Sequence, residues 1–186
     1  MKTTDAKTLQ ETRLDSETLF SGKILQVKRD RVRLPNGNES EREYVQHPGA
    51  VLVVPQLEDG RLVLVRQFRY PVGQVVLEFP AGRCEPNEAP LLSGQRELRE
   101  ETGYVAGEWQ ALGVIDLCVG YSDERIHVFC AQGLTQHGAQ PDPDEFVETV
   151  LWEPTALLEA VASGAVTDGK TLSALLLWQT SKHSNP

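Results

Sequence analysis

Three glutamates lie close together in a segment whose composition predicts a helix. Residues 89–102 are rich in Leu, Glu, Arg and Gln, and Gly103 follows them as a typical C-terminal stop signal. Residues three and four positions apart share one face of a helix, so Glu97, Glu100 and Glu101 would form a single stripe of carboxylates. Two such charges about 4 Å apart repel by roughly 4 kcal/mol at an effective dielectric constant of about 20. The stripe therefore requires either a cation or full exposure to water.

Two interpretations of the stripe follow from charge alone. Clustered carboxylate oxygens suit a hard divalent cation such as magnesium, manganese or calcium better than they suit zinc. In the alternative, the stripe is an ordinary solvated helix face on which Arg96 pairs with Glu100 one turn away. The preceding residues favour the cation, because Gly82 would let the backbone approach a metal or phosphate and Glu88 adds a further carboxylate.

The elements that position this helix are expected to be mainly strands. Two further helices are expected at 155–163 and 171–180. Strands and helices follow one another without regular alternation, so the predicted fold class is α+β, with a mixed β-sheet sandwiched between helices and an N-terminal β-hairpin extension. Runs rich in Val and Leu, separated by Gly, Pro and Asn turn signals, predict strands at 23–34, 41–46, 50–57, 61–68, 74–79, 109–117, 125–131 and 148–152.

The composition excludes several classes of protein. A chain of 186 residues with 40% hydrophobic and 24% charged residues is typical of a folded domain. No apolar run could span a bilayer and residues 1–15 lack the apolar stretch of a secretory signal, so we expect a cytoplasmic protein without a membrane partner. A net charge of −9 without a basic run argues against nucleic acid as a partner. Three cysteines without C-x-x-C spacing argue against disulfides and structural zinc.

The segment 82–104 resembles the Nudix box, the signature of the Nudix hydrolase family. That box reads G-x5-E-x7-R-E-U-x-E-E-x-G-U, in which U is an aliphatic residue. The last position departs from the pattern because Tyr104 stands there, but that position needs only to pack. The resemblance implies the Nudix fold and hydrolysis of a pyrophosphate bond. The other fixed positions are occupied by Gly82, Glu88, Arg96, Glu97, Leu98, Glu100, Glu101 and Gly103.

The resemblance also implies a magnesium cofactor, Mg2+, with Mn2+ as a possible substitute. By their positions in the box, Glu97 and Glu101 would be metal ligands, and Glu100 a further ligand or a carboxylate just behind the ligands. The carbonyl of Ala81 is a candidate additional ligand, and Arg96 would orient the glutamates through charge-assisted hydrogen bonds. Metal ions bridging the two phosphates would activate a water for attack on phosphorus. Glu100 and Arg96 are candidate catalytic residues because the resemblance places them beside these metal ions.

Motifs outside the box resemble the ADP-ribose pyrophosphatases and related nucleoside diphosphate sugar hydrolases. Residues 66–71 (R-Q-F-R-Y-P) and 78–82 (E-F-P-A-G) are similar to the R-Q-x-R-x-P and E-x-P-A-G signatures of that subgroup. Residues 118–124 resemble its S-P-G-x-x-D-E segment, although Cys and Val here replace the Ser and Pro. The similarity extends from residues 20–23 to residues 167–171 (T-D-G-K-T), which is nearly the whole chain.

The same similarity supplies candidate substrate-binding residues. Arg69 is a candidate for the diphosphate and Arg42 for the phosphate or base side, since guanidinium groups suit phosphate oxygens. Glu78 would support the site, and Glu124 of the D-E segment is a further candidate. Each arginine could instead form a structural ion pair, and Glu78 could simply face water at the end of a strand.

The acidic segment 142–148 is expected on a loop that leads into a strand. In the family, a glutamate from such a loop holds the attacking water or serves as the general base. Glu145 is the first choice because it matches the D-E-F-x-E pattern of the family, with Glu148 and Asp144 as reserves. The segment could instead be a solvated acidic loop.

The resemblance favours ADP-ribose as the substrate, cleaved to AMP and ribose 5-phosphate. Hydrolysis of GDP-mannose or another nucleotide sugar is the alternative, and a catalytically silent Nudix-like ligand-binding domain is an alternative of another class. Because the N-terminal strands interlock between subunits in relatives, we expect a homodimer in which residues 1–48 contribute to dimerisation and residues 49–186 form the Nudix hydrolase domain. Phe20, Tyr44 and Trp109 are expected in the core, although each could stack on adenine.

Overall fold

A computed structural model describes residues 8–139 and 146–182 and divides the chain into two compact units. The first, here called the N-terminal unit, takes in the residues up to His47 together with Cys118–Glu124. The second, here called the main unit, takes in Pro48–Leu117 and the chain from Arg125 onward. Within the described residues, no helix is both long and apolar enough to cross a membrane.

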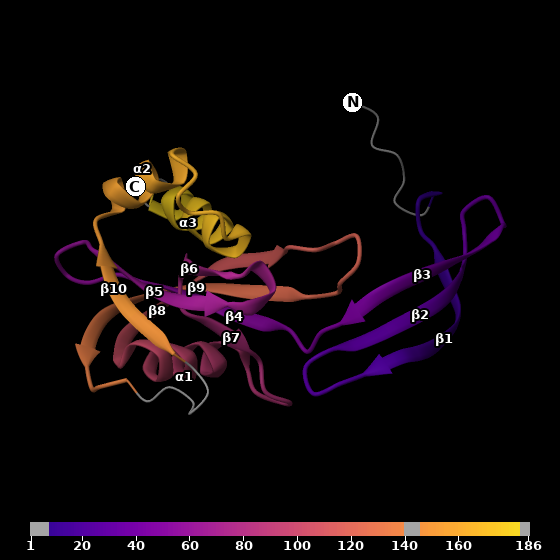
Figure 1. The fold of residues 1–186 in the computed structure, drawn as a ribbon, viewed down its shortest axis with the longest axis horizontal. Helices are drawn as coiled ribbons and strands as arrows, with labels where there is room; N and C mark the ends of the chain where they lie inside the picture. Colours follow the sequence, from indigo (N-terminus) through magenta and orange to yellow (C-terminus); the bar gives the residue numbers. More distant parts are fainter. Residues whose placement is uncertain (1–7, 140–145, 183–186) are drawn as a thin grey trace. The chain divides into compact units, whose positions relative to one another are not determined.

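The N-terminal unit is built on an antiparallel sheet in the order β1-β2-β3 (Figure 1). Its strands are β1 (Thr12–Ser21), β2 (Gln26–Arg33) and β3 (Glu39–Gln46). The hairpin predicted from the Pro-Asn-Gly turn is confirmed as β2 and β3, with the Gly37 N–H donating to the Leu34 carbonyl at 2.9 Å. Strand β1 escapes sequence-based prediction because almost all of its residues are exposed, so no alternation of apolar and polar residues marks it.

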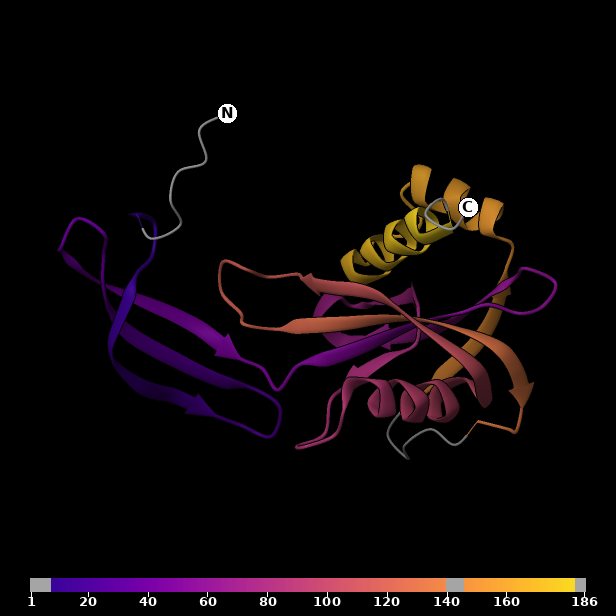
Figure 2. The same cartoon turned by 180° about the vertical axis from the view of Figure 1, so that it is seen from behind.

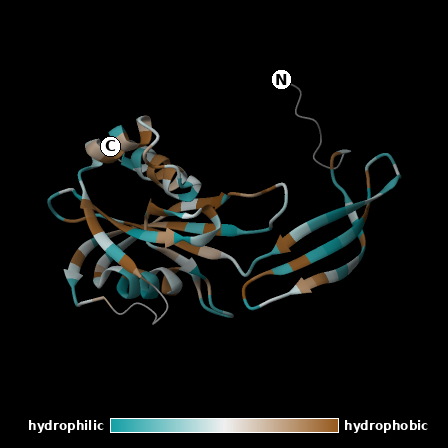
Figure 3. Cartoon of the chain, in the orientation of Figure 1, coloured by the Kyte–Doolittle hydropathy of each residue, from teal (hydrophilic) through white to brown (hydrophobic). Residues whose placement is uncertain are grey.

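Charged side chains stabilise this sheet across its strands. Arg29 contacts Glu43 at 2.7 Å and Glu17 at 3.3 Å, so it joins all three strands. Hydrophilic residues dominate β1–β3 in Figure 3, and Val32 is the one buried hydrophobic residue of these strands. The expectation that Phe20 lies in the core is wrong, because its side chain is 56% exposed at the end of β1.

The main unit holds two sheets. A mixed sheet has the order β7-β4-β9-β8, in which β4 and β9 are parallel and the outer pairs are antiparallel. An antiparallel sheet has the order β10-β5-β6. The predicted strands at 50–57 and 61–68 therefore exist, but the turn between them leads from one sheet to the other. The strands are β4 (Ala50–Pro55), β5 (Leu62–Arg69), β6 (Gln74–Glu78), β7 (Ala81–Arg83), β8 (Tyr104–Asp116), β9 (Arg125–Gln136) and β10 (Val147–Trp152).

Helices cover both faces of the mixed sheet (Figures 1 and 2). Helix α1 (Pro90–Thr102) lies on one face, and α2 (Pro154–Ala162) and α3 (Gly169–Lys182) lie on the other. Strand β4 packs against the helices on both faces of the mixed sheet. Leu52 packs with residues of α2 and α3, whereas Val53 packs with Leu98 of α1. The predicted sandwich of a mixed sheet between helices is confirmed.

Two glycines fix the position and length of α1. A Cβ on Gly94 would lie 3.2 Å from the side chain of Val51, so the glycine allows the helix to approach β4 closely. The helix ends at Gly103, which has a positive φ of 73° and donates its N–H to the Arg99 carbonyl at 2.9 Å. These contacts orient the inner face of α1, which carries two glutamates, toward the sheet.

Candidate active site

Two of the three glutamates of the stripe are buried. Glu97 is 9% exposed and Glu101 is 4% exposed, and both belong to the inner face of α1. The backbone N–H of Ala81 in β7 donates to the Glu101 carboxylate at 3.3 Å. A Cβ on Gly82 would overlap the Glu97 carboxylate, so the glycine of the Nudix box makes room for that side chain. The two carboxylates therefore lie directly against the backbone of β7.

Arg96 connects the glutamates of the stripe to the preceding loop. Its Nη1 donates to Glu97 at 2.7 Å and to Glu100 at 3.1 Å, and its Nη2 donates to Glu88 at 3.2 Å and to the Arg83 carbonyl at 3.1 Å. Burial alone would lower the pKa of Arg96, but the hydrogen bonds and charges of the glutamates outweigh burial and raise it. Arg96 thus joins the helix to the preceding loop, and its role in orienting the glutamates stays a prediction.

Glu88 anchors the loop before α1. Its carboxylate accepts a hydrogen bond from the Ser93 hydroxyl at 2.7 Å and from the Glu85 N–H at 3.4 Å, in addition to the bond from Arg96. These hydrogen bonds, with that of Ser93 first, lower the pKa of Glu88 below its ordinary value. An ionised Glu88 thus joins the loop to the first turns of the helix.

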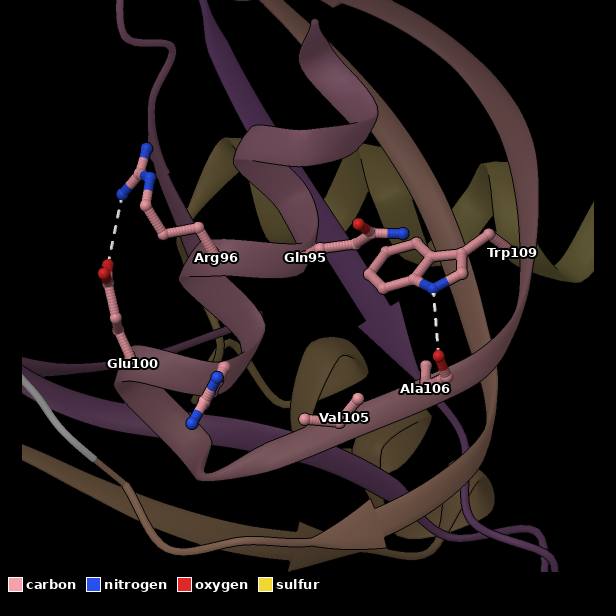
Figure 4. Close-up of a pocket in the computed structure, with 7 residues that line it drawn as sticks. Gln95, Arg96, Glu100, Val105, Ala106 and Trp109 are labelled. Atoms are coloured by element: carbon pink, nitrogen blue, oxygen red, sulfur yellow. Dashed lines mark hydrogen bonds and ion pairs between the residues drawn. The ribbon is translucent and has the colours of Figure 1, made fainter. Parts of the chain in front are cut away.

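A pocket lies on the outer face of α1 (Figure 4). Its volume is about 530 Å³, and it runs from Arg96 and Glu100 at one end to Trp109 of β8 at the other. Trp109 is half-buried and donates its indole N–H to the Ala106 carbonyl at 3.3 Å, so it serves mainly to pack β8 against α1. The ends of Arg96 and Glu100 are accessible from this side.

The donor set beside β7 fits a hard divalent cation in chemical type. Carboxylate oxygens of Glu97, Glu100 and Glu101 and the carbonyl of Ala81 are oxygen ligands of the kind that magnesium prefers. Among residues 8–139 and 146–182, however, no three His, Cys, Asp or Glu side chains converge closely enough to hold a metal by themselves. In this arrangement Arg96 donates hydrogen bonds to Glu97 and Glu100, and Glu101 accepts the Ala81 N–H.

Arg69 and Glu78 form a second charged group in the main unit. The Arg69 guanidinium donates to both oxygens of Glu78, each at 2.8 Å, and Lys170 also donates to Glu78. Glu78 is 1% exposed, so the interpretation of a glutamate facing water is wrong. Burial alone would raise the pKa of Glu78, but Arg69 and Lys170 outweigh burial and hold that pKa below its ordinary value.

Lys170 and Asp168 were missed as site residues by sequence reasoning. Asp168 accepts the backbone N–H of Thr171 at 3.0 Å and thereby caps the first turn of α3. The T-D-G-K-T segment contained a signal for this cap, because an aspartate just before a predicted helix is a typical N-terminal residue. No local signal, however, indicated that Lys170 pairs with Glu78, which lies 92 residues earlier in the sequence.

Arg42 and Glu124 belong to the N-terminal unit. Arg42 forms a bidentate pair with Glu11 at 2.6 and 2.9 Å, as in the ion-pair interpretation. Glu124 lies 3.7 Å from the His47 ring, and its backbone N–H donates to the Ser122 hydroxyl. The loop before Glu124 is ordered by the Cys118 carbonyl, which accepts the N–H groups of Tyr121 and Ser122 at 2.9 Å.

The acidic segment is described only in part. Glu145, the first choice for the base, and Asp144 lie outside the described residues. Glu148 lies in β10, where its carboxylate pairs with Arg66 of β5 at 2.9 Å and remains 63% exposed. Glu148 is therefore paired with the Arg66 guanidinium and also remains accessible to water.

The fold and the carboxylate-bearing helix define this chain as a member of the Nudix hydrolase family. The family model described as the NUDIX domain matches residues 46–175, and a model described as the nucleoside diphosphate sugar hydrolase N-terminal domain matches residues 11–45. The chain belongs to this family and is an enzyme that hydrolyses phosphoric anhydrides.

Individual relatives cover nearly the whole chain. The ADP-ribose pyrophosphatase of Bacillus subtilis (strain 168) is 39% identical over 171 residues, which are 91% of this chain and 92% of that protein. The methanol dehydrogenase activator of Bacillus methanolicus is 36% identical over 182 residues, with 95% and 98% covered. A crystal structure of an ADP compounds hydrolase matches the fold with a TM-score of 0.84 at 24% identity, with 95% of this chain and 97% of that chain covered.

Proposed function

We propose that this enzyme hydrolyses the pyrophosphate bond of ADP-ribose and releases AMP and ribose 5-phosphate. The observation that carries the proposal is the pair of buried carboxylates, Glu97 and Glu101, packed against the β7 backbone within a Nudix box that departs from the pattern only at Tyr104. Similarity to an ADP-ribose pyrophosphatase over 91% of the chain supports the choice of substrate. The alternative of a catalytically silent domain would not explain why two acidic groups are kept buried side by side.

Magnesium is the cofactor that we propose for this site. Glu97, Glu101 and the Ala81 carbonyl would hold it, with Glu100 as a further ligand or a carboxylate just behind the ligands. When bound, the metal would supply positive charge that neutralises the diphosphate and lowers the pKa of a bound water. Arg96 holds Glu97 and Glu100 by charge-assisted hydrogen bonds, so their carboxylates keep fixed orientations before any ligand arrives.

The chain's other charged groups bind the substrate and move the proton. Arg69 would bind phosphate oxygens with the edge of its guanidinium that faces away from Glu78, and Glu78 would hold it in place. Arg42 and Glu124 would contact the nucleotide. Glu145 would accept the proton of the attacking water, with Glu148 and Asp144 as the other candidates for the base.

A hydrolysis panel tests the proposed function. ADP-ribose, ADP-glucose, GDP-mannose, NADH and nucleoside triphosphates would be offered with magnesium to the wild type, to Glu101→Gln and to Glu159→Gln, an exposed glutamate of α2. We expect ADP-ribose to be preferred, and kcat to fall roughly 1,000-fold in Glu101→Gln because several kcal/mol of charge stabilisation are lost. Glu159→Gln should behave as the wild type. A preference for GDP-mannose would show that GDP-mannose, and not ADP-ribose, is the substrate. Unchanged activity in Glu101→Gln would show that Glu101 does not belong to the metal site.

We further propose that the protein is a homodimer to which residues 1–48 contribute. The N-terminal sheet exposes apolar side chains around the turn from β1 to β2, among them Phe20 at 56% and Ile24 at 61%. Exposed apolar residues gathered in this way are typical of contact surfaces. Light scattering should give twice the chain mass for the wild type and a lower mass for a Phe20→Ser, Ile24→Ser variant. A monomeric wild type would contradict the proposal.

A further inference from the structure

Both oxygens of the Glu78 carboxylate are occupied in the interior of the main unit. Arg69 donates to one oxygen from Nε and to the other from Nη2, each at 2.8 Å, and Lys170 donates to the second oxygen as well. Glu78 is 1% exposed, so water does not compete for these bonds. A buried carboxylate is costly unless it is paired and hydrogen-bonded, and here two cations meet that requirement.

Arg69 is held along one edge and free along the other. Its side chain is 42% exposed, and its Nη1 makes no hydrogen bond to any residue that the structure describes. Arg69 lines a cavity of about 360 Å³, together with Gln74 of β6 and Thr167. Nη1 is therefore the group through which this arginine can bind an anionic ligand.

Lys170 is arranged differently from Arg69. Its side chain is only 14% exposed, and its Nζ donates to Glu78 and, at 2.8 Å, to Asp168. Asp168 in turn accepts the Thr171 N–H, and the Thr171 hydroxyl accepts the Phe79 N–H at 3.0 Å. The charges of this cluster therefore cancel, because it contains two carboxylates and two cations, and its contacts connect the start of α3 to the end of β6. The members are Glu78, Asp168, Arg69 and Lys170.

We propose that Lys170 is a positioning residue, which together with Asp168 fixes Glu78 so that Arg69 presents its free edge to the substrate diphosphate in one orientation. This inference rests on the proposed function, because it assigns Lys170 a role through Arg69. Without Lys170, Glu78 would retain one cation only, and a single guanidinium can neutralise the carboxylate from several orientations. Fixing a binding group in advance removes an ordering cost that binding would otherwise include.

A double-mutant cycle tests this role directly. Lys170→Met, Arg69→Ala and the double variant would be compared with the wild type for hydrolysis of ADP-ribose at saturating magnesium. We expect Lys170→Met to raise KM about tenfold and to change kcat less than about threefold, as when ground-state binding is weakened. In the Arg69→Ala background the same substitution should have no further effect, because residues that act as a unit are not additive.

Three further variants separate positioning from a loss of folding. Lys170→Arg keeps the cation and should restore KM to within about threefold of the wild type. Asp168→Asn keeps Lys170 but weakens its anchor, so it should raise KM by less than Lys170→Met. Lys182→Met removes an exposed lysine from the same helix and should leave KM unchanged.

The outcomes distinguish this inference from the proposed function. An equal rise in KM on both backgrounds would show that Lys170 acts independently of Arg69 and would overturn the inference while ADP-ribose hydrolysis stands. If the wild type did not hydrolyse ADP-ribose, the proposed function would fail. The coupling between Lys170 and Arg69 would then be measured by calorimetric titration of the wild type, the two single variants and the double variant with ADP. Equal losses of ADP affinity on both backgrounds, or binding to none of the four, would then overturn the inference too.

Discussion

The two units of this enzyme are stabilised by different interactions. In the main unit, β4 and β5 hold runs of fully buried aliphatic residues, such as Leu52 and Leu64, in a core shared with α2 and α3. In the N-terminal unit, ion pairs such as Arg31 to Asp15 at 2.6 Å connect β2 to β1, a strand whose residues are almost all exposed. Exposed ion pairs contribute little net stability, whereas buried apolar area contributes much. The comparison teaches that a large buried apolar core holds the elements of the main unit in place, whereas Val32 is the one buried hydrophobic residue in the strands of the N-terminal sheet.

The largest expected effect is on the core of the main unit. Leu64→Ala removes a fully buried side chain and should cost about 2–5 kcal/mol through lost burial and a cavity. In thermal unfolding this corresponds to a fall in Tm of roughly 10 °C for a chain of this size. Leu151→Ala, at a position that is 39% exposed, is the matched control and should change Tm much less. Equal losses at both positions would contradict the description of this core.

A smaller effect is expected where the core meets the site. Gly82→Ala would push the Glu97 carboxylate aside, since a Cβ there overlaps it. The displaced group is the end of a flexible side chain, so we expect little change in Tm but a loss of about 100-fold in kcat, as when a reacting group is misplaced by roughly 1 Å. Gly107→Ala is the control, because a Cβ there meets only the Gly133 carbonyl at 3.7 Å. An unchanged kcat in Gly82→Ala would show that catalysis does not depend on the position of the Glu97 carboxylate.

The smallest effect is expected in the N-terminal sheet. Arg31→Ala removes exposed contacts to Asp15 and Glu39, and we expect Tm to change by less than about 2 °C. Salt screens such pairs, so the difference should shrink further between low and high NaCl in the same thermal scans. A fall in Tm as large as that of Leu64→Ala would show that ion pairs do stabilise this unit.

The sequence predicted those features that depend on local signals. Helix α1 follows from its composition and from Gly103, and the β2–β3 hairpin follows from its turn residues. The stripe of glutamates and its contact with Arg96 could be anticipated because helix periodicity brings together residues three and four positions apart.

Non-local features could not be predicted in the same way. Whether β4 and β5 share a sheet depends on partners far along the chain, since β4 pairs with β9 and β5 with β10. Strand β1 lacks a buried face, and so it lacks the alternation that marks a strand. Lys170, which pairs with the buried Glu78, comes from a position 92 residues later in the sequence.

The most direct test of the account is product analysis with ADP-ribose. The wild type would be incubated with magnesium, with EDTA, and with EDTA followed by excess magnesium, and the products would be separated by chromatography. The account predicts AMP and ribose 5-phosphate in equal amounts, no products with EDTA, and recovery when magnesium is restored. Unchanged hydrolysis in EDTA, or release of ADP and free ribose instead, would contradict a metal-assisted attack on the pyrophosphate at the α1 glutamates.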